Sequence, residues 1–220
     1  MLRDTLKNQD YFDNYIKIEY SRIEKFVRTL DTINKSTPQY IQCKKYIANF
    51  YRNLINATYS VGNNKDEITV IVKKYFEYFD FGSDVGYADL IDALSLIILF
   101  DVNVIGINKN VISDTLMQVF YTYIESKKYD VKNEYSLLYE NQYKIYMDAL
   151  NGKISCEEFV SYINENWYDS NADMYWFDSH KKATDTYTGY WCWAGAAIAK
   201  MLNYPNNIIS SSKYIPYEIK

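Results

Sequence analysis

The side chains best suited to covalent chemistry in this chain are its single histidine, His180, and the nearby cysteine Cys192. A cysteine thiol becomes a nucleophile when a histidine accepts its proton, and Asp178 could orient the imidazole. Cys192 stands, however, between two tryptophans at the start of an apolar stretch, where a thiol is usually inert. We therefore favour structural roles for His180 and Cys192, with a Cys–His enzyme as the alternative.

Motifs for metal or phosphate binding are missing from the sequence. The three cysteines, Cys43, Cys156 and Cys192, are widely spaced, without a Cys-x-x-Cys pair or a His-Glu-x-x-His motif. Glycine-rich phosphate loops and a Gly-x-Ser-x-Gly turn are also absent. We therefore expect no catalytic residue, no cofactor and no bound metal, and free thiols in a reducing compartment.

Acidic side chains gather in the second half of the chain. Residues 111–180 hold 12 acidic and 5 basic side chains, whereas residues 1–110 hold 14 of each. Nucleic-acid binding needs clustered Lys and Arg, so we expect no direct contact with nucleic acid. An acidic face attracts a basic protein partner and accelerates its association. The alternative is a solvated surface that serves only solubility.

Three of these acids, Asp169, Asp173 and Asp178, lie close together in the segment that precedes His180. Together they could coordinate a hard cation, although the spacing of an EF-hand is missing. We favour a contact with a protein partner, because large aromatic side chains, which are common at interfaces, accompany them. The candidate partner-binding residues are Asp169, Asp173, Tyr175, Trp176, Asp178, Glu157 and Glu165.

Helical periodicity predicts an all-α protein of about eight helices. Seven Gly and three Pro leave few breaks for a sheet protein with many turns. The first two helices, joined by a short turn, should form an antiparallel hairpin, with Glu19 among the solvated charges of the first. The run 68–72 is β-branched and could form a strand, but the pattern continues helically to residue 79. The expected helices span about 8–34, 38–59, 65–79, 87–100, 111–127, 135–150, 156–167 and 189–200.

The polar link 127–133 predicts the organisation of the chain. It separates an N-terminal helical region, 1–127, from a C-terminal helical region, 134–220, in what we expect to be one compact globule. The chain shows neither a secretory signal nor an apolar run of about 18 residues. We therefore expect a cytoplasmic protein that does not contact membranes.

The most apolar stretch lies near the end of the chain, where no charge occurs between Asp185 and Lys200. Bulky rings followed by alanines and a glycine are typical of a helix that is buried on all sides. We expect this helix to form the centre of the C-terminal half. The residues assigned to this structural core are His180, Gly189, Tyr190, Trp191, Trp193, Ala197 and Pro216.

Two dense aromatic motifs and several shorter ones follow one another along nearly the whole chain. They are Arg3-Asp4, Tyr11-Phe12-Asp13, Tyr59-Ser60-x-Gly62, Tyr87-x-Asp89-Leu90, Tyr175-Trp176-Phe177-Asp178-Ser179-His180-Lys181, Gly189-Tyr190-Trp191-x-Trp193 and Tyr214-Ile215-Pro216-Tyr217-Glu218. In this order they resemble the motifs of the PoNi-like immunity proteins. The two dense aromatic motifs are the most specific part of the resemblance.

The resemblance implies a bacterial immunity protein of a polymorphic toxin system used in interbacterial competition. Such proteins are all-helical inhibitors rather than enzymes, and each binds a cognate PoNe-type DNase effector of the PD-(D/E)xK superfamily. The effector is delivered by a secretion apparatus such as a type VI system, and binding protects the producer and its kin. A DNase presents a basic groove, which suits an acidic partner. The alternative is a helical adaptor whose partner is not a toxin.

The chain departs from the pattern of that family at two places. Ala194 stands where the family often has Glu, and Pro205 and Asn206 replace an acidic pair. Both changes remove negative charge from the region after the second aromatic motif. We therefore expect partner specificity to reside in the acids of 169–178 and in the helices expected at 135–150 and 156–167.

Overall fold

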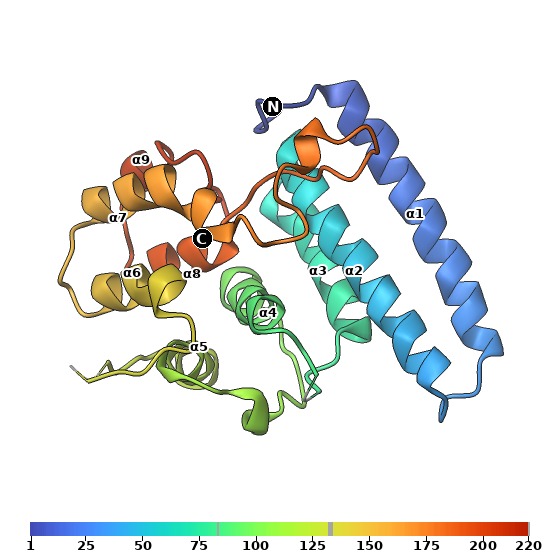
Figure 1. The fold of residues 1–220 in the computed structure, drawn as a ribbon, viewed down its shortest axis with the longest axis horizontal. Coiled ribbons are helices and arrows are strands. Elements are labelled where there is room, and N and C mark those ends of the chain that lie inside the picture. Colours follow the sequence, from blue (N-terminus) through green and yellow to red (C-terminus); the bar gives the residue numbers. More distant parts are fainter. Residues whose placement is uncertain (83, 132–133, 220) are drawn as a thin grey trace. The chain divides into compact units, whose positions relative to one another are not determined.

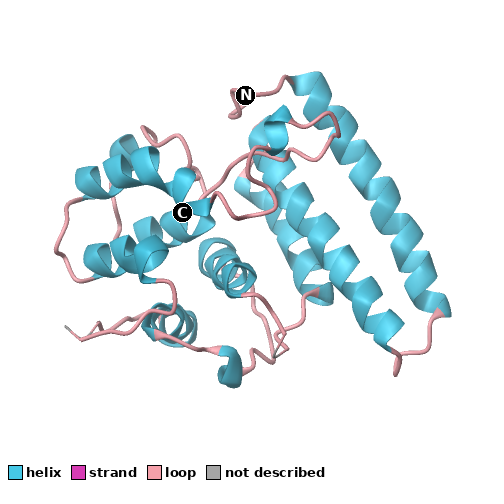
Figure 2. Ribbon diagram, in the orientation of Figure 1, coloured by secondary structure: helices cyan, strands magenta, loops and turns pink. Residues whose placement is uncertain are grey.

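A computed structural model describes residues 1–82, 84–131 and 134–219, and the regular structure within these ranges is entirely helical (Figure 2). This confirms the all-α class. The chain divides into two compact units. The first unit comprises Met1–Asp80 and Asp178–Gly189, and the second comprises Phe81–Phe177 and Tyr190–Lys220. The described part of the polar link, 127–131, therefore falls inside the second unit, and residues 132 and 133 of the link lie outside the described residues.

Three helices build the first unit: α1 (Gln9–Thr32), α2 (Pro38–Val61) and α3 (Lys65–Tyr78) (Figure 1). α1 and α2 lie side by side and are joined by a short turn, as expected of a helical hairpin. Thr37 caps α2 by accepting a hydrogen bond from the Tyr40 amide, and a proline follows in the first turn. The β-branched run 68–72 is helical, with Ile68, Ile71 and Val72 on its buried side.

Glu19 of α1 contradicts the expectation of a solvated charge, since its side chain is fully buried. Its carboxylate accepts hydrogen bonds from Asn53 Nδ2 on α2 at 2.8 Å and from Tyr15 Oη at 3.3 Å, and it pairs with Arg22 at 2.8 Å. A buried carboxylate is stable only when it is paired and hydrogen-bonded in this way. The spacing of apolar residues along α1 gave no sign of these partners.

Six α-helices lie in the described part of the second unit: α4 (Tyr87–Phe100), α5 (Thr115–Ser126), α6 (Glu140–Leu150), α7 (Cys156–Tyr162), α8 (Trp193–Met201) and α9 (Asn206–Ile209). A capping box between Ser155 and Glu158 starts α7, which continues as a π-helical turn over Ile163–Trp167. α8 packs against α4 and is the buried helix that the sequence indicated.

α8 begins later than the predicted residue 189 because the chain before it is irregular and bonds to the segment near the C-terminus. The Cys192 amide donates to the Tyr214 carbonyl at 2.8 Å, and the Cys192 Sγ accepts from the Gly195 amide at 3.3 Å. Cys192 is therefore the N-cap of α8. At its other end, the Lys200 ammonium donates to the carbonyls of Ile98 and Leu99 at the end of α4, at 2.7 and 3.2 Å.

α6 also begins later than predicted, at Glu140 rather than near residue 135. The segment before it runs along the start of α5: Thr115 N donates to Ser136 O, and Ser136 N donates to Thr115 Oγ1, both at 3.0 Å. Asp114, the N-cap of α5, also accepts from the Leu138 amide at 3.2 Å. These bonds pair the polar backbone groups of the segment with the start of α5 instead of with a longer α6. Leu138 and Tyr139 of this segment are exposed.

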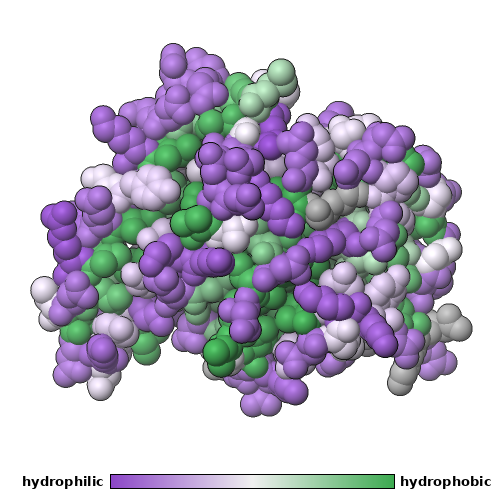
Figure 3. Space-filling view, turned by 180° about the vertical axis from the view of Figure 1, so that it is seen from behind, coloured by the Kyte–Doolittle hydropathy of each residue, from purple (hydrophilic) through white to green (hydrophobic). Residues whose placement is uncertain are grey.

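Hydrophilic residues cover most of the face drawn in Figure 3, and hydrophobic residues are visible between them. In the part of the chain that the structure describes, no helix combines the length and apolar character needed to cross a membrane.

Candidate functional site

A groove of about 770 Å³ opens in the second unit between the start of α6 and the segment 169–173. Gln142 of α6 bridges its two walls by donating to the Ser170 carbonyl at 2.8 Å. This hydrogen bond links the two walls of the groove. It is lined by Leu138, Tyr139, Glu140, Asn141, Gln142, Asp169, Ser170, Ala172 and Asp173.

One wall of the groove presents two large apolar side chains to solvent. Leu138 is 59% exposed and Tyr139 is 52% exposed. The backbone of Leu138 is held by Asp114, and the Tyr139 ring packs edge-on against Tyr87 of α4, with centroids 4.8 Å apart. Exposed apolar groups whose positions are already fixed lose little entropy on binding, which suits them to partner contact.

The charged side chains in the lining are all acidic. Glu140, Asp169 and Asp173 are exposed, and none of them forms an ion pair with a Lys or Arg within the described residues. The lysines of this region, Lys144 and Lys153, both pair with Asp148, further along α6. The groove therefore combines negative charge with apolar surface.

A cluster of stacked rings supports the segment that carries Asp169 and Asp173. Trp176 stacks on Trp167 with centroids 5.4 Å apart and planes at 17°. Tyr168 stacks on Phe177 at 4.6 Å and contacts the Tyr190 ring at 4.9 Å. Trp176 is thus half-buried within the cluster, whereas its neighbour Tyr175 is 67% exposed.

The other predicted contact residues lie outside the groove lining. Glu157 is exposed in the first turn of α7, and Glu165 is exposed in the π-helical turn, where it accepts from Ser161 Oγ at 2.9 Å. Asp178 belongs to the first unit and pairs with Lys181 at 2.9 Å. Within the described residues, no group of three or more His, Cys, Asp or Glu side chains is arranged to hold a metal ion.

His180 and Cys192 have separate partners. Cys192 is buried, with its Sγ 3.2 Å from the Tyr146 hydroxyl, and burial raises the pKa of its thiol to about 12. Such a thiol is protonated at neutral pH and is a poor nucleophile. The His180 ring packs edge-on against Tyr187 in the first unit, with centroids 6.0 Å apart. These surroundings fit structural roles for both residues.

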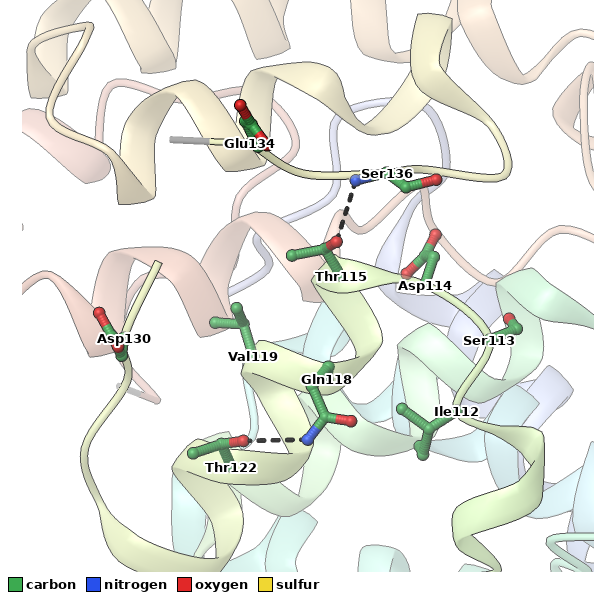
Figure 4. A pocket seen from close by; sticks show the side chains of 10 residues that line it. All are labelled: Ile112, Ser113, Asp114, Thr115, Gln118, Val119, Thr122, Asp130, Glu134 and Ser136. Atoms are coloured by element: carbon green, nitrogen blue, oxygen red, sulfur yellow. Dashed lines mark hydrogen bonds between the residues drawn. The ribbon is translucent and has the colours of Figure 1, made fainter. Parts of the chain in front are cut away.

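A second cavity, of about 410 Å³, lies beside the start of α5 (Figure 4). Asp114 lines it, but its carboxylate already caps α5 and accepts a 2.5 Å hydrogen bond from the Tyr87 hydroxyl. Asp130 and Glu134 come from the neighbouring segments. Figure 4 shows the Thr115–Ser136 hydrogen bond at its edge. Most of its polar groups therefore serve the local fold, and we favour the groove at α6.

The N-terminal motifs meet the segment Asp178–Gly189 inside the first unit. The Tyr187 hydroxyl donates to the buried Asp4 carboxylate, and the Tyr11 hydroxyl donates to the Tyr187 carbonyl at 2.9 Å. Ser60 Oγ donates to the Thr188 carbonyl at 2.9 Å. These motif residues thus bind the segment Asp178–Gly189, which follows α7 in the sequence.

Arg3 and Gly62 secure the N-terminus on the end of α2. Arg3 donates to the Tyr59 carbonyl at 3.0 Å, and its guanidinium lies 4.4 Å from the centre of the Tyr59 ring. Gly62 has φ +104°, and a Cβ there would lie 2.0 Å from the Met1 carbonyl oxygen. Only glycine fits this position without strain.

The assigned core residues occupy three settings. Trp193 and Ala197 are buried in α8, and Tyr190 and Pro216 are buried elsewhere in the second unit, whereas Gly189 is buried at the end of the first unit's segment Asp178–Gly189. Trp191 is half-buried and precedes the helix, and His180 is half-buried in the first unit.

Comparison with known families agrees with this distribution of motifs. The model for the N-terminal part of the PoNe immunity proteins (PoNi) matches residues 3–112, and the model for their C-terminal part matches residues 112–219. The chain belongs to the PoNe immunity protein family. This PoNi protein matches none of the curated proteins and none of the solved structures with which it was compared. The junction of the two PoNi family regions, at residue 112, lies between α4 and α5, within the second unit.

The sequence of this PoNi protein pointed to residues on one wall of the groove but did not single out residues on the other. Asp169 and Asp173 were predicted contact residues, and the expected helix at 135–150 was named as a region of specificity. Leu138, Tyr139 and Glu140 were not singled out individually, because within a helix predicted from residue 135 they looked like ordinary helical positions. The proximity of Leu138 to Asp114 and of Tyr139 to Tyr87 depends on contacts distant in sequence.

Proposed function

We propose that this PoNi protein protects its cell by binding and neutralising a cognate nuclease effector in the cytoplasm. The observation that carries the proposal is the family match from residue 3 to residue 219. The groove at α6 supports it, because it offers apolar surface and uncompensated negative charge to a protein partner.

Charge complementarity favours a nuclease as that partner. A nuclease binds the phosphate backbone of DNA with Lys and Arg side chains, so its substrate-binding surface is basic. Glu140, Asp169 and Asp173 would attract such a surface and steer its approach. Exposed Glu157 and Glu165 would add to the same field. An acidic surface of this kind would compete with DNA rather than bind it.

Inhibition by binding fits the chemistry of the described residues better than enzymatic inactivation does. The strongest enzyme hypothesis required Cys192 as a nucleophile, and this thiol is buried and held against Tyr146. Partner-binding roles for Tyr175 and Trp176 remain part of the proposal. Tyr175 offers an exposed ring, and Trp176 stabilises the segment that presents it.

Co-expression tests the proposal. The nuclease domain encoded beside this gene should arrest growth of a host cell when produced alone, and growth should recover when this protein is produced with it. Cys192→Ser should rescue as well as the wild type, because the thiol has no chemical role. Persistent toxicity in the presence of soluble, folded protein would refute the proposal, and rescue that depends on the Cys192 thiol would favour an enzyme.

A further inference from the structure

We infer that the groove between α6 and the segment 169–173 receives a basic segment of the effector that also carries an apolar side chain. The inference rests on the proposed function and assigns the recognition to particular residues. Leu138 and Tyr139 would contact the apolar side chain. Glu140, Asp169 and Asp173 would pair with Lys or Arg side chains on either side of it.

The apolar wall indicates a protein ligand with an apolar group. Leu138 and Tyr139 are adjacent and both exposed, so they present more apolar surface together than a single exposed side chain does. Their backbone and ring are fixed by Asp114 and Tyr87, which belong to the start of α5 and to α4. An incoming leucine- or phenylalanine-sized group would bury apolar area on a surface that needs no rearrangement.

The acids indicate the charge of the ligand. They come from both walls, with Glu140 on α6 and Asp169 and Asp173 opposite it across the Gln142–Ser170 hydrogen bond. A cationic side chain entering the groove would therefore meet carboxylates on two sides. Because Lys144 is already paired with Asp148, these carboxylates are available to the partner.

The size of the groove limits how much of the partner it can hold. A volume of about 770 Å³ is in the range that encloses a few side chains and is too small for a folded domain. The occupant we infer is therefore a protruding segment of the effector. Contacts outside the groove, through Tyr175 or the exposed acids of α7, would complete the interface.

Binding measurements with the purified, catalytically inactivated nuclease domain test the inference. Leu138→Ala should raise Kd by about tenfold or more, mainly through faster dissociation. The double variant Asp169→Lys, Asp173→Lys should slow association by about tenfold and weaken its dependence on salt. Both changes are at exposed positions, so circular dichroism and the melting temperature should stay close to those of the wild type.

Matched changes on the first unit provide the controls. Val70→Ala removes an apolar side chain that is 63% exposed on α3, and Asp31→Lys reverses an exposed acid on α1. Both should leave Kd and the association rate unchanged. If the wild type binds the effector and the groove variants bind as tightly as these controls, the groove is not the contact and the inference fails alone. If the wild type does not bind the effector, the proposed function fails as well.

Discussion

At the scale of single residues, Asp101 shows how charge is used inside the second unit. It ends α4 in the left-handed conformation, with φ 50°. Its carboxylate accepts from Lys200 at 2.6 Å and from Lys127 at 2.9 Å. Partial burial acts to raise the pKa of Asp101, but the two lysines outweigh it and hold the pKa below its ordinary value. One side chain thus links the ends of three helices.

This arrangement predicts a pH-dependent stability. Because the pKa of Asp101 is lowered in the folded protein, its charge adds to the free energy of unfolding above the unfolded pKa, near 3.8. This contribution is lost as pH falls through the folded pKa. Asp101→Asn tolerates the left-handed backbone but removes the charge. It should lower the free energy of unfolding at pH 7 by about 1 kcal/mol or less, since the side chain is half exposed.

The difference in the free energy of unfolding between Asp101→Asn and the wild type should shrink as pH falls below about 4. Urea denaturation at several pH values would measure this difference. Asp31→Asn is the control, because Asp31 forms no ion pair within the described part of the chain. A difference that is constant from pH 7 to pH 3 would show that the charge of Asp101 does not stabilise the fold.

At the scale of elements, α8 is the helix on which the second unit depends. Ala196, Ala197 and Ala199 are fully buried, and small side chains at these positions let α4 approach closely. Trp193 opens the helix and packs against Phe100 of α4, with ring centroids 6.2 Å apart. The two tryptophans of this motif therefore differ: Trp193 is 2% exposed, while Trp191 is only half-buried.

Truncation of the two tryptophans should separate these roles. Trp193→Ala should cost about 3–5 kcal/mol of unfolding free energy, because it leaves a cavity between α8 and α4. Trp191→Ala should cost clearly less. Thermal and urea unfolding of the two variants would measure the difference, and equal losses would contradict the packing described for α8.

Periodicity predicted the helices well where the apolar stripe was long and a cap or a loop with glycines marked its start. α2, α3 and α4 begin at the predicted residues because Thr37, Asn64 and the glycine-rich loop before Tyr87 mark their starts. The predicted starts of α6 and α8 were wrong, because the residues before each helix form hydrogen bonds with Thr115 and Tyr214 instead of helical ones. Those partners are distant in sequence and leave no local signal.

The candidate site divides in the same way. The charge pattern singled out Asp169 and Asp173, because an excess of acid is visible from composition alone. Leu138 and Tyr139 became candidates only when the structure showed them exposed and fixed in position. The sequence thus predicted the negative charge of this surface, and the structure showed its shape.

At the scale of the whole molecule, the family motifs divide between two tasks. Those of the N-terminus hold Tyr187 and Thr188 within the first unit, and those of the C-terminus build α8 and the ring cluster of the second. Most of these residues are buried or engaged with one another. The recognisable motifs therefore specify the fold, and the groove beside them presents the residues proposed to meet the partner.

Cleavage of DNA by the nuclease, measured with increasing amounts of this protein, tests whether the protein neutralises the nuclease by binding it. We expect cleavage to fall in proportion to the protein added and to stop near equimolar amounts, because each bound molecule blocks one nuclease. Undiminished cleavage with a large excess of folded protein would contradict binding inhibition. Complete loss of cleavage at a small fraction of the equimolar amount would instead indicate catalytic inactivation.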